Sequence, residues 1–201
     1  MIMTTIEKLA VVMPASWVPG PKQGQWNYKD YASLPEDGHY YEVVNGVLYM
    51  SPAPSTGHQE IVGWIFFYLV THVKLPDLGR VYQAPTDVEL RPEDVVQPDV
   101  FVVLKPHLHR ITSSRLIGAP DLVVEVASPS TARHDLDEKL HSYARAEVPE
   151  YWVVNPDAQT VEVLVWQNWG YSSLGLFGGH TMLPSQVVPD FPVSVEQFFA
   201  G

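Results

Sequence analysis

The chain has 201 residues, of which 46% are hydrophobic, and a formal net charge of −11 at neutral pH. This length is ample for one sizeable core and short for two, and the acidic balance argues against broad non-specific binding to nucleic acids or to anionic membranes. The absence of cysteine excludes disulfides and thiolate metal sites and is compatible with a cytoplasmic protein.

The N-terminal 25 residues are rich in Pro and Gly, which predicts an extended arm ahead of a single domain over residues 26–201. The first residues lack the basic region and the long apolar run of a signal peptide. A short helix is expected from Tyr28 to Leu34, because Pro35 then ends the helical pattern.

A β-hairpin is expected next, in HYYEVVNGVLYMS. Asn-Gly between two β-rich runs is the strongest short-range hairpin signal. A two-residue turn at Asn45-Gly46 pairs Val44 with Val47. The same register places the carboxylate of residue 42 opposite the tyrosine of residue 49.

The rest of the chain alternates between helical and strand patterns. Its most apolar helical stretch, Ile61 to Val73, has about 13 residues, whereas a membrane-spanning helix needs about 20, so a buried core helix is expected. The expected elements are a helix over 58–73, one or two strands around Pro85 over 81–90, a strand over 95–104, a basic loop over 105–119, a strand over 120–127, a helix over 131–147 with Ser130 or Thr131 as N-cap, and strands over 150–155, 161–166 and 171–177. This order predicts a mixed α/β domain, a central mixed sheet flanked by two main helices, with an N-terminal hairpin and C-terminal strands.

Two of the apolar strands each carry one carboxylate. VVQPDVFVVL places Asp99 inside an apolar run, and PDLVVEVA places Glu125 inside another. Burial raises the pKa of a carboxyl group unless a cation or hydrogen bonds stabilise the anion. A divalent cation bound by both residues would stabilise both anions, and Mg²⁺ suits such a site because it takes one or two carboxylates and keeps several waters.

Each acid also has an ordinary structural interpretation. A strand acid often faces solvent, and this alternative applies directly to Asp99. Glu125 differs, because its two flanking valines point to the opposite face and it shares its own face with Val123 and Ala127, which are expected to be buried. The occurrence of two such acids favours a site.

Three further residues are candidates for the same site. Glu42 lies in the hairpin, where periodicity alone favours a solvent-facing acid. Lys139 lies on the flank of the buried face of the 131–147 helix and could reach the C-terminal end of the Glu125 strand; the alternative is a snorkelling lysine that covers apolar surface. His58 opens the first long helix and could face the same cleft, although a histidine there is more often a cap or a surface group.

The sequence blocks YYEVVNG, HQEIV, VVQPDVFVV, GAPDLVVEVASPST and DLDEKLHSYARAEVPEYWVVNP follow one another in this order. Together they resemble the Uma-type family of "putative restriction endonucleases", part of the PD-(D/E)XK nuclease superfamily. The similarity runs from Tyr28 to the C-terminus and implies an α-β-β-β-α-β core. By resemblance, this core comprises the helix 58–73, strands near 81–90, 96–104 and 120–127, the helix 131–147 and the strand 150–155.

The resemblance also implies the site residues. The superfamily aspartate matches Asp99, the glutamate matches Glu125, and Glu42 matches an acidic position of the family's first hairpin. The superfamily lysine would fall two residues after the glutamate, where this chain has Ala127. The resemblance implies that the following helix supplies the lysine instead, as Lys139.

In the implied mechanism Asp99, Glu125 and the carbonyl of Val126 hold Mg²⁺ or Mn²⁺. The metal polarises a phosphodiester and lowers the pKa of a bound water. Lys139 orients or deprotonates that water and offsets charge on the phosphate. Glu42 would hold a second metal or a metal-bound water.

The function expected from these residues is a metal-dependent DNA endonuclease. The alternative is a catalytically inactive nuclease-fold protein that acts as a binding or assembly module. A carboxylate-based hydrolase acting on sugars has little support, because no long aromatic-lined cleft is evident in the sequence.

Two interactions are expected of such an enzyme. The acid-free segment that contains Lys105, Arg110 and Arg115 joins the two carboxylate strands, so these residues are expected to contact DNA phosphates. A two-fold homodimer is expected because cutting both strands of a duplex favours two symmetry-related sites. The apolar tail FPVSVEQFFAG could contribute to the dimer or pack on its own core.

Overall fold

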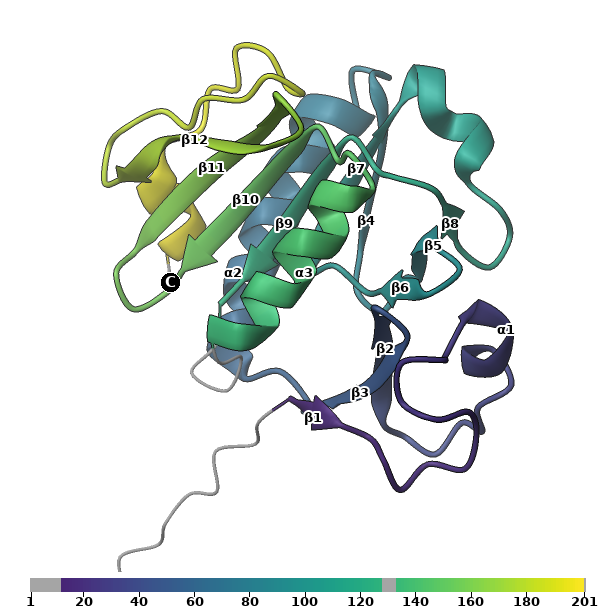
Figure 1. Ribbon diagram of the computed structural model, residues 1–201. Coiled ribbons are helices and arrows are strands. Elements are labelled where there is room, and N and C mark those ends of the chain that lie inside the picture. The colour runs from purple at the N-terminus through teal and green to yellow at the C-terminus, as the bar shows by residue number, and fades with distance from the viewer. Residues whose placement is uncertain (1–11, 128–132, 201) are drawn as a thin grey trace, which may run out of the picture.

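The computed structural model describes residues 12–127 and 133–200, which form two six-stranded sheets with helices around them (Figure 1). The larger sheet has the strand order β12-β11-β10-β9-β7-β4. Its strands are β4 (Gly79–Gln83), β7 (Val100–Leu104), β9 (Leu122–Val126), β10 (Glu150–Asn155), β11 (Thr160–Gln167) and β12 (Gly170–Gly178). The pair β9 and β10 is parallel and the other neighbours are antiparallel, so the sheet is mixed as expected.

The smaller sheet contains the predicted hairpin. Its order is β1-β3-β2-β6-β5-β8. The strands are β1 (Met13–Pro14), β2 (Tyr40–Val44), β3 (Val47–Ser51), β5 (Val88–Arg91), β6 (Asp94–Val96) and β8 (Leu116–Ile117). The predicted register is confirmed, with Val44 opposite Val47 and Glu42 opposite Tyr49. Asn45 and Gly46 both have positive φ angles, as a two-residue turn of this kind requires.

Helices cover both faces of the larger sheet. They are α2 (Thr56–Leu69), which continues as a π-helical turn (Val70–Lys74), and α3 (Arg133–Arg145). The short helix α1 (Tyr28–Tyr31) contacts β2 of the smaller sheet, and 3-10 turns lie at Lys105–Arg110 and Val195–Phe199. In Figure 1, α2 lies behind the sheet and α3 in front of it. The proposed caps of α3, Ser130 and Thr131, lie outside the described residues. Within 12–127 and 133–200, no helix is both long enough and apolar enough to cross a membrane.

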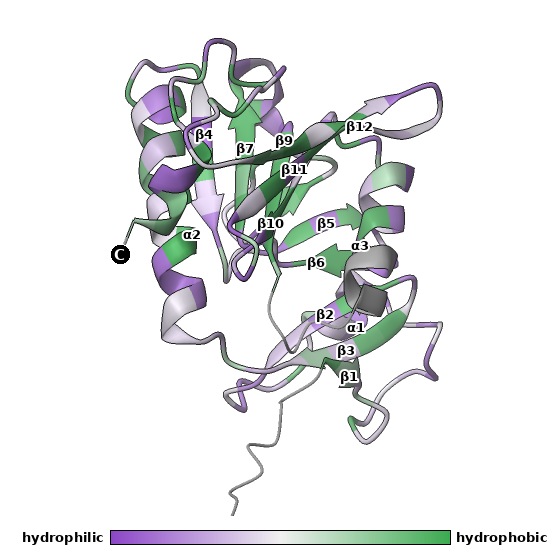
Figure 2. Ribbon diagram, turned by 90° about the vertical axis from the view of Figure 1, so that its left-hand side faces the viewer, coloured by the Kyte–Doolittle hydropathy of each residue, from purple (hydrophilic) through white to green (hydrophobic). Residues whose placement is uncertain are grey.

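The alternation of side chains along the central strands produces the two halves of the core. In β9, Leu122 and Val124 pack with α2, whereas Val123 faces the opposite side with Tyr143 of α3. The central strand β7, which consists of apolar residues alone, is accordingly coloured as hydrophobic in Figure 2. The C-terminal segment packs on its own core, because Phe198 is fully buried on the α2 side.

The expected single strand over 95–104 is wrong. The structure has two strands there, β6 in the smaller sheet and β7 in the larger one, separated by Gln97, Pro98 and Asp99. Proline lacks the N–H group that a central strand needs for its ladder, so pairing ends at this point. The stretch around Pro85 likewise divides into β4 and β5 in different sheets. The chain therefore crosses the seam between the sheets at 84–87 and at 97–99.

Asp94 fixes α3 against the smaller sheet. This aspartate is fully buried at the start of β6. It accepts hydrogen bonds from the backbone N–H of Asn45 at 2.7 Å and from Ser142 Oγ at 2.9 Å, and it pairs with Arg145 at 3.2 Å. Because Ser142 and Arg145 belong to α3 and Asn45 to the hairpin turn, Asp94 links the C-terminal part of the helix to this turn.

Candidate functional site

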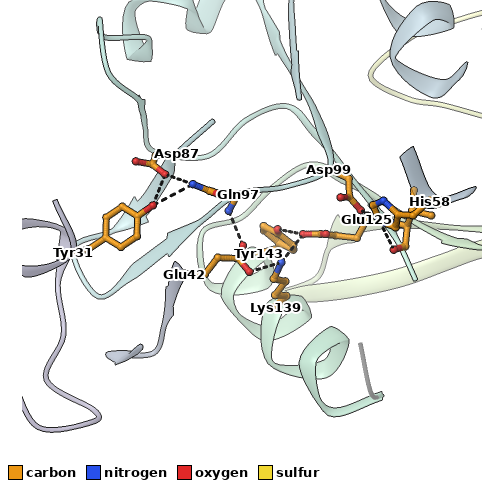
Figure 3. Close-up of polar contacts among 10 residues, drawn as sticks. Tyr31, Glu42, His58, Asp87, Gln97, Asp99, Glu125, Lys139 and Tyr143 are labelled. Atoms are coloured by element: carbon orange, nitrogen blue, oxygen red, sulfur yellow. Dashed lines mark hydrogen bonds and ion pairs between the residues drawn. The ribbon is translucent and has the colours of Figure 1, made fainter. Parts of the chain in front are cut away.

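Lys139 lies between two carboxylates that come from different sheets (Figure 3). Its Nζ is 2.9 Å from Oε2 of Glu42 on β2 and 3.3 Å from Oε1 of Glu125 on β9. Glu42 is 5% exposed, and Glu125 and Lys139 are each 6% exposed. The interpretations of Glu42 as a solvent-facing acid and of Lys139 as a snorkelling lysine are therefore wrong, and both residues lie in the interior of the site.

Tyr143 is a further residue of the site, which the sequence patterns did not identify. Its hydroxyl donates to Oε1 of Glu125 at 2.6 Å. Tyr143 follows Lys139 by four residues, so both side chains leave the same face of α3 and reach the same carboxylate oxygen. This spacing is the signal that could have identified it.

Glu42 is held on both of its oxygens. Oε2 contacts Lys139, and Oε1 accepts a hydrogen bond from the backbone N–H of Gln97 at 2.7 Å. Gln97 belongs to the segment that crosses between the sheets, and sequence reasoning gave it no role. The crossing segment therefore positions the Glu42 carboxylate, and this carboxylate positions the ammonium group of Lys139.

Asp99 and His58 meet at the end of β9. Oδ2 of Asp99 accepts the backbone N–H of Val126 at 2.7 Å and lies 3.2 Å from Nε2 of His58. The same imidazole nitrogen is 3.1 Å from the carbonyl oxygen of Val126. Ser55, not His58, caps α2, because the Ser55 side chain accepts the N–H of His58. His58 therefore faces the site, next to the residue that follows Glu125.

Burial dominates the electrostatics of Glu125. Desolvation raises the pKa of its carboxyl group, and the net result after all neighbours is a pKa of about 8. The positive charge of Lys139 and the hydrogen bond from Tyr143 lower that pKa, while the negative charges of Asp99 and Glu42 raise it. Although the ion pair with Lys139 favours the anion, the neutral acid is therefore the preferred form at pH 7 in the protein alone.

His58 responds to the same carboxylates in the opposite sense. Burial lowers the pKa of its imidazole, but the hydrogen bond and charge of Asp99 raise it, with smaller contributions from Glu125 and the Val126 carbonyl. The net pKa lies above the ordinary value for histidine. The carboxylate of Asp99 therefore favours the protonated form of this imidazole.

The donor set fits a hard divalent cation. Both contacts of Asp99 are made through Oδ2, and both contacts of Glu125 through Oε1, so the other oxygen of each carboxylate has no protein donor among the described residues. These oxygens and the carbonyl of Val126 are ligands of the kind that Mg²⁺ prefers. In the described ranges no three His, Asp or Glu side chains form a metal-binding cluster. An ion would therefore be held by two carboxylates, a carbonyl and waters.

The cations of the basic segment all have acceptors within the protein. Lys105 pairs with Asp77 at 2.5 Å, Arg110 donates to the carbonyl of Ala119 at 2.6 Å, and Arg115 pairs with Glu89 at 2.6 Å while its guanidinium lies 3.6 Å over the ring of Tyr28. The pair made by Lys105 is exposed, whereas that of Arg115 is mostly buried. Their contact with DNA remains a prediction, and it applies best to Lys105 because exposed ion pairs are weak.

Comparisons with known proteins bear on the fold and the family. The family model Uma2, described as "Putative restriction endonuclease", matches residues 28–196. A crystal structure described as a "putative nuclease belonging to DUF820" from Anabaena variabilis ATCC 29413 has a TM-score of 0.71 and 21% sequence identity, and the match covers 87% of this chain and 97% of that chain. No curated protein matches. At this identity the structural likeness shows the fold alone.

Glu125→Gln is expected to raise the melting temperature of the metal-free protein at pH 8. The pKa of Glu125 rises from an ordinary 4.5 to about 8 on folding, so between these pH values the unfolded chain is ionised while the folded chain is not. Stability is therefore lost as pH rises through this window, and glutamine removes the loss. Each unit of pKa difference between the folded and the unfolded chain corresponds to about 1.4 kcal/mol, and each kcal/mol shifts the melting temperature by about 2–4 °C at this chain length.

The measurement is a melting series in EDTA from pH 4.5 to pH 8, spanning the ordinary and the raised pKa of Glu125. The difference in melting temperature between Glu125→Gln and wild type should vanish at pH 4.5 and be largest at pH 8. Glu162→Gln, at a partly exposed position of β11, is the matched control. A lower melting temperature for Glu125→Gln at pH 8 would show that the ionised carboxylate is stabilised by Lys139 and Tyr143.

Proposed function

The chain belongs to the Uma2 family, whose model spans residues 28–196, and we propose that it is a metal-dependent DNA endonuclease that hydrolyses phosphodiester bonds. The observation that carries this proposal is the position of the Lys139 ammonium, 3.3 Å from Glu125 and buried beside the strand that Asp99 contacts. In this proposal, a lysine from α3 takes the role that the superfamily pattern assigns to residue 127. The nuclease fold and the three characteristic residue types are then present together.

The proposed ligands of the metal are Asp99, Glu125 and the carbonyl of Val126. When bound, Mg²⁺ or Mn²⁺ supplies Lewis-acid polarisation of the phosphodiester. Asp99 is already oriented by the N–H of Val126 and by His58, so one carboxylate and the carbonyl are held next to each other before any ion arrives. His58 is in this proposal a positioning residue for both.

Lys139 is proposed to stabilise negative charge on the phosphate. A preorganised ammonium in a buried site is worth more than in water, because little solvent screens it and no reorganisation is needed. Glu42 acts through Lys139, since its Oε2 holds the ammonium and its Oε1 is fixed by Gln97. A direct role of Glu42 at a second metal remains a prediction and would require the pair with Lys139 to open.

The second candidate function is a nuclease-fold module that binds without catalysis. The net charge of −11 and the protein partners of Lys105, Arg110 and Arg115 favour it, because both features weaken contact with DNA phosphates. It differs from the first candidate in one measurable respect, namely the absence of cleavage with any divalent cation.

Purified protein is expected to cleave plasmid DNA with Mg²⁺ or Mn²⁺ and not with EDTA. Asp99→Asn and Lys139→Met should each lower the cleavage rate by at least about 100-fold, the loss typical of removing an electrostatic stabiliser of the transition state. Since Lys139→Met leaves two buried acids without their cation, its fold is checked by the melting temperature, and Lys139→Arg serves as the charge-retaining variant. Glu162→Gln is the control with retained activity, and a wild type that binds DNA but never cleaves it would support the second candidate.

Contacts of the basic segment with DNA are expected to appear in the salt dependence of binding. Lys105→Ala and Arg110→Ala should each lower the slope of log affinity against log salt by about 0.9, evenly across sequences. Arg115→Ala should lower stability more than the slope, because its guanidinium is held by Glu89 and Tyr28. Binding is measured with Ca²⁺ in place of Mg²⁺, with the exposed Arg91→Ala as control. An unchanged slope in the Lys105→Ala, Arg110→Ala double variant removes this segment from the DNA-binding surface.

A two-fold dimer is expected in solution, because one site per chain cuts both strands of a duplex most directly when two sites are related by symmetry. The C-terminal tail does not provide the contact surface, since Phe191 and Phe198 are buried in the chain's own core. Sedimentation at micromolar concentration, with and without DNA, measures the mass. A monomer under both conditions contradicts the expectation.

A further inference from the structure

A cavity of about 380 Å³ lies at the seam between the two sheets, beside the candidate site. It is formed by the crossing segments after β4 and before β7 and by the loop that precedes β8. The residues used below from its wall are Tyr82, Asp87, Gln97, Phe101 and Ser114. This volume is within the range of small-molecule sites, about 300–1,000 Å³, and is sufficient for one nucleobase.

Two residues of the cavity wall, Asp87 and Gln97, are joined by a hydrogen bond. Oδ1 of Asp87 accepts from the hydroxyl of Tyr31 at 2.8 Å and from Nε2 of Gln97 at 2.9 Å (Figure 3). Because a carboxylate only accepts, the Gln97 amide is oriented with its nitrogen toward Asp87 and its Oε1 away from it. Within the described part of the chain, Oδ2 of Asp87 and Oε1 of Gln97 receive no hydrogen bond. Both are therefore available to a ligand that brings donors.

Tyr31 secures this arrangement. Burial, followed by the charge of Asp87 and the hydrogen bond to it, raises the pKa of the Tyr31 phenol far above its ordinary value. The phenol therefore stays protonated and donates to Asp87. The Asp87 carboxylate and the Gln97 amide are held in place by hydrogen bonds within the protein, and this is the form of a preorganised recognition site.

Another side of the cavity is aromatic. The ring of Tyr82 is stacked on that of Phe101, with centroids 5.2 Å apart and an interplanar angle of 22°. Phe101 is buried beneath it at 1% exposure. A supported aromatic ring is the surface on which an unpaired base stacks in many nucleic-acid-binding proteins, at a gain of about 1–3 kcal/mol per base.

The cavity and the candidate site share one residue. The side chain of Gln97 lines the cavity, while its backbone N–H holds Glu42, which in turn holds Lys139. Asp99 follows two residues later in the same segment. A base in the cavity would therefore belong to a nucleotide close to the phosphate that the site cleaves.

We propose that this cavity binds a guanine base extruded from the substrate DNA. Guanine presents two adjacent donors, N1–H and the N2 amino group, which match the acceptors of Asp87 and Gln97. Thymine places carbonyl oxygens on both sides of its single donor and would meet these acceptors with repulsion. Enzymes that act on duplex DNA reach such pockets by flipping a nucleotide out of the stack. The DNA source of the base rests on the proposed function, but the recognition of guanine does not.

The first experiment measures dGMP and dTMP binding by NMR titration in EDTA, where no cleavage takes place. Wild type should bind dGMP at least about tenfold more tightly than dTMP, the discrimination expected when a site built for hydrogen bonds meets a ligand that leaves them unpaired. Asp87→Asn should lose the preference. Ser114→Trp introduces a bulky side chain at the wall of the cavity, at a residue outside the hydrogen bonds of Tyr31, Asp87 and Gln97, and should lose binding altogether, so a folding defect in one variant leaves the other informative.

Asp37→Asn is the matched control, because Asp37 also accepts a tyrosine hydroxyl, that of Tyr41 at 2.9 Å, but lies outside the cavity. Its dGMP binding should equal that of wild type. Equal affinity for dGMP and dTMP, or binding that survives in Asp87→Asn and Ser114→Trp, overturns the proposal.

The second experiment tests the source of the base. An oligonucleotide whose guanines are replaced by hypoxanthine, which lacks the amino group, should bind at least about tenfold more weakly than the same oligonucleotide with guanine. If dGMP binds selectively while the hypoxanthine oligonucleotide and the original guanine oligonucleotide bind equally, a free guanine nucleotide is the ligand and the extruded base is ruled out. If dGMP binds selectively but no DNA is ever cleaved, the endonuclease fails and the guanine site stands; cleavage with no preference for dGMP refutes the guanine site alone.

Discussion

The Lys139 ammonium, held between Glu42 and Glu125, is the interaction on which the arrangement of the candidate site depends. It joins a strand of the smaller sheet, a strand of the larger sheet and α3 at one buried point. Removing one partner of a buried ion pair costs about 3–5 kcal/mol, because the remaining charge stays buried without compensation. Two carboxylates and one ammonium carry an excess negative charge when all are ionised. The raised pKa of Glu125, about 8, removes this excess by keeping that group neutral.

The crossing segment at Gln97 and Asp99 connects this charge cluster with the rest of the molecule. One backbone N–H fixes Glu42, the adjoining side chain lines the cavity, and Asp99 reaches the end of β9. The residue between them, Pro98, has a restricted φ angle and is buried, so the relative positions of its neighbours are narrowly set. Any ligand that moves the Gln97 side chain acts on the same short segment that places both acids.

The sequence predicted the parts of this arrangement that depend on local pattern. Asn45-Gly46 determined the hairpin register, and strand alternation placed Glu125 on the face of Val123, which is fully buried. The burial of Glu42 could not be predicted from its own strand, because it is covered by α3 and β6, which lie far along the chain. The division of residues 95–104 into two strands was missed, because valines on both sides of Pro98 satisfy a strand pattern. The valines before Pro98 belong to the smaller sheet and those after it to the larger one.

The negative charge of each acid of the site is compensated in a different way, and this explains how three acids coexist in one buried site. Glu42 is paired with Lys139, Glu125 retains its proton through burial, and Asp99 is balanced by His58 and by the N–H of Val126. Two of these interactions, those of Glu125 and of Asp99 with His58, depend on a proton that can be released. A divalent cation bound by Asp99 and Glu125 would take over their function, because it favours the ionised form of each carboxylate, and its binding would be coupled to proton release. The lysine pair, which involves no proton on an acid, would keep its geometry through that exchange and so hold α3 in place in both forms.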